Sequence, residues 1–167
     1  MILMHRRGAT AALAALFLLP ACSGNGLTAA GRSDVKAQTI TVVITSSNGA
    51  HHFQVEIAKT EQEQQRGLMF RTDIPRDGGM LFAPYPPSGP PAEARFWMKN
   101  TPTPLDIIFI RRDGSIAHIA ENTTPFSEAS VESGEPVAAV LELRGGRTAE
   151  LGIAEDDMVH WPGRASR

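Results

Sequence analysis

The sequence contains a single cysteine, Cys22, close to the start of its 167 residues. A disulfide bond within one chain is therefore excluded, and residues 23–167 offer no thiol as a zinc ligand or nucleophile. Neither sign of charge is in excess, because Lys and Arg number 16 and Asp and Glu number 18. This balance lacks the strongly basic character of nucleic-acid-binding domains, so we expect no nucleic acid among the partners.

An apolar segment follows a short positive region at the N-terminus. Ala9–Leu19 is too short to span a bilayer well, and together with Arg6 and Arg7 it is typical of a secretory signal. Leu19–Cys22 resembles a bacterial lipobox, in which the cysteine becomes the lipidated first residue of the mature protein. We therefore expect residues 1–22 to be a signal peptide and the protein to be exported, periplasmic and tethered to the membrane through Cys22. Ordinary cleavage after a small residue further along is the alternative.

The rest of the chain predicts one domain with flexible ends. Residues 23–38 are rich in Gly, Ser, Ala and Asn, which is typical of a tether. Residues 39–162 form the predicted globular domain, and residues 163–167 a disordered tail. The 15 glycines and 12 prolines favour many turns, and hence short strands rather than long helices.

A hairpin and a short helix open the domain. Thr39–Thr45 is almost entirely β-branched and predicts a strand, and His52–Ala58 alternates apolar and polar residues as a second strand does. Thr60 and Glu63 match a capping box, so we expect a short helix that runs to about Arg66.

The middle of the domain mixes short apolar runs with proline-rich turns. We expect Leu68–Phe70 to pack inward, Gly79–Phe82 to form a strand, and Arg95–Lys99 to form another. Pro84–Pro91 lacks backbone donors, and we expect it to be a surface loop.

Leu105–Ile110 and Ile116–Glu121 predict a second hairpin. Asp113-Gly114 favours a two-residue type I′ turn, which would place Ile110 opposite Ala117. The same register places the carboxylates of Asp106 and Glu121, at the two strand ends, opposite each other. A divalent cation or Lys99 between them would explain that pair, and simple fraying of the strand ends is the alternative.

The last third predicts three further elements. Val137–Leu143 is an apolar run of either strand or helix, Thr148–Leu151 one helical turn, and Met158–Trp161 a closing strand. The predicted fold is mainly β, or β-rich α+β: a small closed or nearly closed barrel of six or more short strands with one or two short helices.

Four segments resemble successive motifs of one prokaryotic family, domain of unknown function 192. They are Arg66–Arg71, Gly79–Phe82, Phe96–Thr101 with Leu105-Asp106, and Val140–Leu143 followed by Gly145. The resemblance spans roughly residues 42–159. It implies a compact, mostly β domain that is often exported, and it implies no activity and no catalytic residues.

Polar residues between two apolar runs identify a candidate site. Phe96–Met98 and Ile107–Ile110 flank a proline-containing centre that carries an ammonium group, an amide and a carboxyl group. Such groups at strand ends can hold a polar ligand. The predicted binding residues are Arg66, Trp97, Lys99, Asn100, Asp106 and Glu142.

A purely structural explanation competes with this site. Asn100 could cap its loop, Lys99 could pair with Asp106, and Glu142 could neutralise Arg66 or a neighbouring arginine. A related possibility is an aromatic platform for a sugar or peptide, formed by Phe82, Tyr85, Phe96 and Trp97.

Two functions follow from the candidate site. The first is a small cell-envelope binding or accessory module that holds an unidentified polar small molecule or an envelope protein at a barrel mouth. The alternative is a hydrolase that uses Asp106 or Glu142 as general base. We expect no cofactor. We also expect no metal, since the methionines that could bind a soft metal, such as Met80 and Met98, lie in apolar runs where they usually fill core space.

Overall fold

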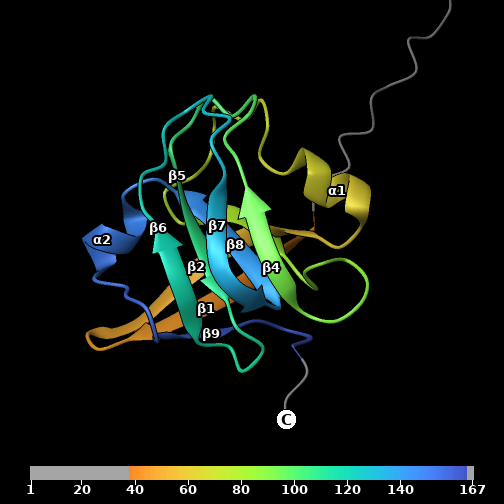
Figure 1. The fold of residues 1–167 in the computed structure, drawn as a ribbon. Helices are drawn as coiled ribbons and strands as arrows, with labels where there is room; N and C mark the ends of the chain where they lie inside the picture. Colours follow the sequence, from red (N-terminus) through yellow and green to blue (C-terminus); the bar gives the residue numbers. More distant parts are fainter. Residues whose placement is uncertain (1–37, 165–167) are drawn as a thin grey trace, which may run out of the picture. The chain divides into compact units, whose positions relative to one another are not determined.

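The structure is a computed structural model that describes residues 38–164. Within these residues the chain forms nine strands and two short helices (Figure 1). In chain order they are β1 (Thr39–Ser46), β2 (Gly49–Ala58), α1 (Glu61–Arg66), β3 (Gly78–Phe82), β4 (Ala92–Phe96), β5 (Leu105–Ile110), β6 (Ile116–Ala120), β7 (Val131–Val137), β8 (Ala139–Arg144), α2 (Arg147–Leu151) and β9 (Met158–His160). The predicted signal peptide, Cys22 and nearly all of the tether lie outside the described residues, as do the last three residues of the tail.

Seven of the strands form one sheet that curves into a nearly closed barrel. Its order is β6-β5-β8-β3-β2-β1-β9, with β2 and β3 parallel and the other pairs antiparallel. The two edges meet through a bridge between Ser115 and Met158. Two backbone bonds reinforce it, from Ile116 N to Asp157 O at 2.9 Å and from Val159 N to Gly114 O at 2.8 Å. The predicted β-rich, nearly closed barrel is confirmed.

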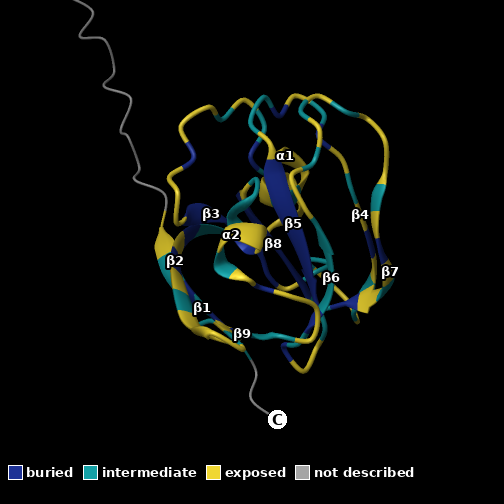
Figure 2. Cartoon of the chain, turned by 90° about the vertical axis from the view of Figure 1, so that its left-hand side faces the viewer, coloured by how far each residue is buried: buried dark blue, intermediate teal, exposed yellow. Residues whose placement is uncertain are grey.

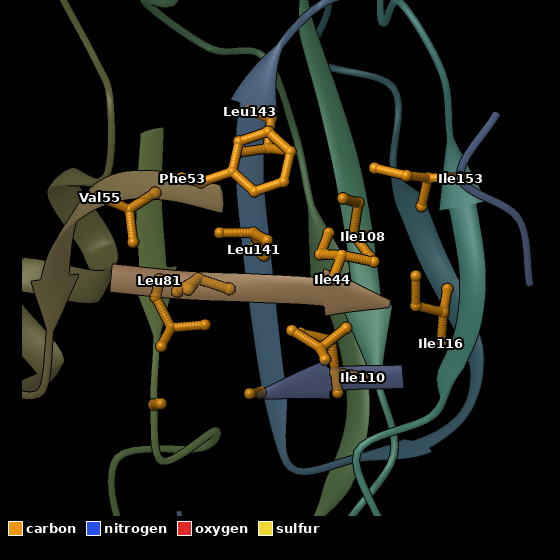
Figure 3. Packing of buried hydrophobic residues seen from close by; sticks show 14 residues of the cluster. Ile44, Phe53, Val55, Leu81, Ile108, Ile110, Ile116, Leu141, Leu143 and Ile153 are labelled. Atoms are coloured by element: carbon orange, nitrogen blue, oxygen red, sulfur yellow. The ribbon is translucent and has the colours of Figure 1, made fainter. Parts of the chain in front are cut away.

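The barrel interior is filled by apolar side chains from all around the sheet. Alternate residues of each strand point inward, and Figure 3 shows them meeting between β1 and the wall formed by β5 and β8. They include Ile44, Phe53, Leu81, Ile108, Ile110, Leu141 and Leu143, all fully buried. The interior is therefore a packed core and not an open channel.

A second apolar layer covers one outer side of the barrel. β4 and β7 form a separate two-stranded sheet, which Figure 2 shows beside the strands of the barrel. Met80, Phe82, Phe109 and Val140 point outward from the barrel into this layer. Strands β3, β5 and β8 are thus buried on both faces, which explains why their sequences are almost continuously apolar.

The predicted helix start is confirmed by its hydrogen bonds. The Thr60 side chain accepts a bond from Glu63 N, and the Glu63 carboxylate accepts one from Thr60 N at 2.9 Å. Neither helix of the described chain is long and apolar enough to cross a membrane.

The loop of the β5–β6 hairpin differs from the predicted two-residue turn. Ile110 pairs with Ile116, and not with Ala117, because a β-bulge interrupts the ladder after Phe109. Asp113 Oδ1 accepts a bond from Ser115 N at 3.0 Å, so the turn side chain bonds its own backbone and widens the loop. Before the bulge, Ile108 pairs with Ile119, which agrees with the predicted register.

Strand β7 was not predicted, and the strand at residues 95–99 is displaced to Ala92–Phe96. The segment VESGEPV contains Gly134 and Pro136, which are typical of a loop. It forms a strand nonetheless, because it pairs with β4. Since β4 is its only ladder partner within the described sheets, the other side of β7 is an edge. A proline at such an edge interrupts few hydrogen bonds.

Asp106 is a buried structural link between three segments. Its Oδ1 accepts bonds from Asn122 N and Gly146 N at 2.8 Å each, and its Oδ2 accepts bonds from Thr148 N and Thr148 Oγ1 at 2.7 Å each. The side chain therefore joins β5 to the loop after β6 and serves as a remote cap for the start of α2.

Asp106→Asn is expected to lower the free energy of unfolding by about 2–4 kcal/mol, because an amide group can replace only one of the two accepting oxygens. Urea unfolding followed by circular dichroism measures this change. Asp73→Asn is the control, since the side chain of Asp73 is 79% exposed and its loss should cost under about 0.5 kcal/mol. Equal stability of the two variants would contradict the structural role of Asp106.

Candidate functional site

A pocket of about 580 Å³ opens on the outer side of the barrel, between α1, the end of β3, β8 and the segment that follows β4. Five of the six predicted binding residues line it: Arg66, Trp97, Lys99, Asn100 and Glu142. Asp106 does not line it. The hypothesis placed these residues at a barrel mouth, whereas the structure places them on the outside of the barrel wall.

Glu142 reaches the pocket because of its position in the strand alternation. Its neighbours Leu141 and Leu143 point into the barrel, so Glu142 points to the outer side. It lies opposite Met80 of β3 and Ile107 of β5, in a strand flanked on both sides. Only 5% of its surface is exposed.

The carboxyl group of Glu142 has an unpaired oxygen. Its Oε2 has no hydrogen-bond partner among the described residues. Burial raises the pKa of Glu142 from an ordinary value of 4.5 to about 8, so the group is protonated at neutral pH. The expected neutralisation by a nearby arginine does not occur, because Arg71 pairs instead with Glu56 at 2.9 Å and with Asp73.

Aromatic side chains and one glycine shape the pocket around this carboxyl group. The rings of Phe82 and Phe96 lie 5.1 Å apart, and those of Tyr85 and Phe96 lie 5.7 Å apart. A Cβ atom at Gly67 would lie 3.2 Å from Phe82 Cζ and 3.8 Å from Glu142 Oε2. The missing side chain at Gly67 therefore keeps space beside Glu142.

The rim of the pocket carries the other predicted residues. Trp97 is 47% exposed, and Lys99 Nζ lies 4.9 Å from the centre of its ring. The predicted pair of Lys99 with Asp106 does not form, since Lys99 approaches Glu128 at 3.9 Å instead. Asn100 has a positive φ of 54°, and its backbone oxygen accepts a bond from Phe70 N at 2.8 Å.

Gln64 is a pocket residue that the sequence analysis missed. Its Nε2 donates to Ala58 O at 3.1 Å and to Pro84 O at 2.8 Å, which ties α1 to the proline-rich loop. Its Oε1 is buried and has no partner within residues 38–164. A glutamine in a short polar helix looks solvent-exposed in a sequence, so no local signal could have identified it.

Two exposed phenylalanines were also missed. Leu68 packs inward as predicted, but Phe70 is 68% exposed and Phe126 is 63% exposed. Both have a positive φ, of 63° and 59°, which is rare for a bulky residue and typical of functional sites. Phe126 N donates to Thr101 O at 3.1 Å, so both phenylalanines are attached to the segment that carries the rim residues.

A larger pocket of about 910 Å³ lies beside Trp161. Its rim carries Lys59, Arg112 and Arg164, but its described lining includes no buried polar side chain. The smaller pocket is the better candidate site because it contains a buried carboxyl group, that of Glu142, whose protonation a ligand can change. Between residues 38 and 164, no group of three or more His, Cys, Asp or Glu side chains is placed to hold a metal ion.

Residues 42–161 match the family described as an uncharacterized ACR, domain of unknown function 192 (DUF192). The chain belongs to this family. The match runs from within β1 to just after β9, and it includes every residue that lines the pocket beside Glu142.

Two solved structures resemble this DUF192 domain. A protein of unknown function from Novosphingobium aromaticivorans DSM 12444 is 42% identical with a TM-score of 0.72, over 77% of this chain and 89% of that one. A protein from Sinorhizobium meliloti 1021, described as a proposed transcription regulator, is 39% identical with a TM-score of 0.72, over 78% of this chain and 98% of that one. No curated protein matches the chain.

The buried carboxyl group predicts a pH-dependent stability. Because the pKa of Glu142 is raised to about 8, the folded protein keeps its proton while the unfolded chain, with a pKa near 4.5, releases it. Stability should therefore fall as the pH rises from about 4.5 to about 8. Glu142→Gln removes this loss, so its stability relative to the wild type should rise by about 3–5 kcal/mol across that range.

Urea unfolding of both proteins at pH 5 and pH 8 measures this difference. Glu121→Gln is the control, since Glu121 is exposed and should follow the wild type at both values. A constant difference between Glu142→Gln and the wild type would show that folding does not raise the pKa of Glu142.

Proposed function

We propose that this domain is a small cell-envelope binding module, and that the pocket beside Glu142 holds a polar ligand. The observation that carries the proposal is a buried carboxyl group with an unpaired oxygen inside an open, aromatic-lined pocket. A buried polar group without a partner destabilises a fold by about 1–3 kcal/mol. An apolar residue would fit this central strand better, unless a ligand supplies the missing partner.

The other pocket residues have complementary roles in the proposal. Phe82, Phe96 and Tyr85 contact the apolar part of the ligand, and the side chain of Gln64 offers a hydrogen-bond acceptor. Arg66, Trp97, Lys99 and Asn100 hold its polar end at the rim. Asp106 has no part in the site, because both of its oxygens already accept two hydrogen bonds.

The proposal has a fluorescence test, because the chain has only two tryptophans and each lies at a different pocket. Trp161→Phe leaves Trp97 as the reporter of the pocket beside Glu142, and Trp97→Phe leaves Trp161 as the reporter of the other. A library of polar small molecules is screened against both variants. Hits are expected to change Trp97 emission, and Glu142→Leu should lower their affinity at least about tenfold. Hits that act only on Trp161 would contradict the proposal.

A hydrolase is the second candidate, and the raised pKa of Glu142 favours it. A carboxyl group with a pKa of about 8 is protonated at neutral pH and would act first as a general acid. This differs from the general base expected from the sequence. In a hydrolase, Glu142→Gln abolishes turnover but leaves ligand affinity within about threefold, because the amide keeps the shape of the side chain.

We also propose export and attachment through a lipid on Cys22, on the strength of the N-terminal sequence. Cells grown with a radiolabelled fatty acid should label the wild type and not Cys22→Ala. Fractionation should then find the wild type with the membrane and the variant in the periplasm. An unlabelled wild type recovered from the periplasm would support export and contradict the lipid attachment at Cys22.

A further inference from the structure

The inside and the rim of the pocket beside Glu142 differ in charge. Inside, Glu142 is the buried titratable group, and the aromatic side chains of Phe82, Phe96 and Tyr85 line the same space. Aromatic rings attract cations through their faces, and a carboxylate pairs with them. The interior is therefore suited to an organic ammonium group.

The rim has the opposite preference. Its cations are Arg66, Arg95 and Lys99, and the acidic residues near them are Glu61, Glu128 and Glu132. Arg95 is engaged with Glu132 at 3.1 Å. Lys99 Nζ lies 3.9 Å from the carboxylate of Glu128, too far for a hydrogen bond, and Arg66 has no ion pair within the described residues. These two side chains can therefore meet an anionic group.

Ligands of a single charge fit this arrangement poorly. A plain anion can accept a hydrogen bond from protonated Glu142, but it makes no use of the aromatic faces, and a plain cation makes no use of Arg66 and Lys99 at the rim. A neutral sugar makes no use of the charges of Arg66 and Lys99. A molecule with both charges pairs with the interior and the rim together.

We infer that the ligand is a zwitterionic amino compound, a short peptide or an amino acid, whose ammonium group pairs with Glu142 and whose carboxylate meets Lys99 and Arg66. This inference rests on the proposed binding function and names its ligand class. A pocket of about 580 Å³ has room for a dipeptide.

Binding of an ammonium group should release a proton. Without ligand, Glu142 is protonated at pH 7, because burial raises its pKa to about 8. A cation beside it favours the carboxylate, so the carboxyl group gives its proton to the buffer and forms an ion pair with the ligand. The other titratable or charged groups around the pocket are Glu61, Arg66, Tyr85, Arg95 and Lys99. Of these, Glu61 is exposed.

The test uses L-phenylalanyl-L-alanine as the probe and isothermal titration calorimetry at pH 7. Titration in phosphate and in Tris, which differ in ionisation enthalpy, gives the number of protons released. We expect about one proton for each ligand bound. Two matched analogues should each bind at least about tenfold more weakly. They are 3-phenylpropionyl-L-alanine, which lacks the amine, and L-phenylalanyl-L-alaninamide, which lacks the carboxylate. L-Phenylalanine alone distinguishes an amino-acid ligand from a peptide.

Three variants link the effect to the pocket. Glu142→Gln should lower the affinity for the dipeptide and abolish proton release. Lys99→Ala should also lower the affinity for the dipeptide, but it should leave proton release intact. Glu121→Gln, a control on an exposed glutamate, should change neither. Lys99 is partly exposed, so its substitution tests the inference even where a variant of Glu142 folds poorly.

The outcomes separate this inference from the proposed function. Equal binding of the amine-free analogue without proton release would overturn the zwitterion while leaving the pocket as a binding site. No binding of any of these four compounds would also overturn it, and the pocket itself would then be judged by the Trp97 screen. Binding reported by Trp161 alone would contradict both.

Discussion

The structure depends on burying both faces of β3, β5 and β8. One face of each strand packs inside the barrel and the other packs against the layer that contains β4 and β7. Within these strands every residue except Arg144, at the end of β8, is therefore buried. Two carboxyl groups, Asp106 and Glu142, nevertheless lie in them, and each must have its burial compensated.

The two carboxyl groups are compensated in different ways. Asp106 is surrounded by backbone donors and a hydroxyl group, which replace the water that the group loses on folding. Glu142 has no such donors at its Oε2 and remains protonated, beside a space kept open by Gly67. The first arrangement fixes a fold, whereas the second leaves an unmet interaction that a ligand can satisfy.

Local patterns predicted the elements where a single short-range interaction controls them. The capping box of Thr60 and Glu63 predicted the start of α1, and the apolar runs predicted β3, β5 and β8. Elements were missed or wrongly predicted where a distant partner decides the conformation. β7 is a strand despite Pro136 because β4 lies beside it, and Phe70 is exposed because a bond to Asn100 holds its backbone in a left-handed conformation.

The sequence by itself determined the β-rich class, the order of the family motifs, and five of the residues that line the pocket. Only the tertiary structure decided which carboxyl group is paired and which faces the pocket. The reason is that the donors to Asp106 include Gly146 and Thr148, which lie 40 and 42 positions away in the chain. Patterns of neighbouring residues carry the period of a strand, but they do not say which distant groups folding will bring to its side chains.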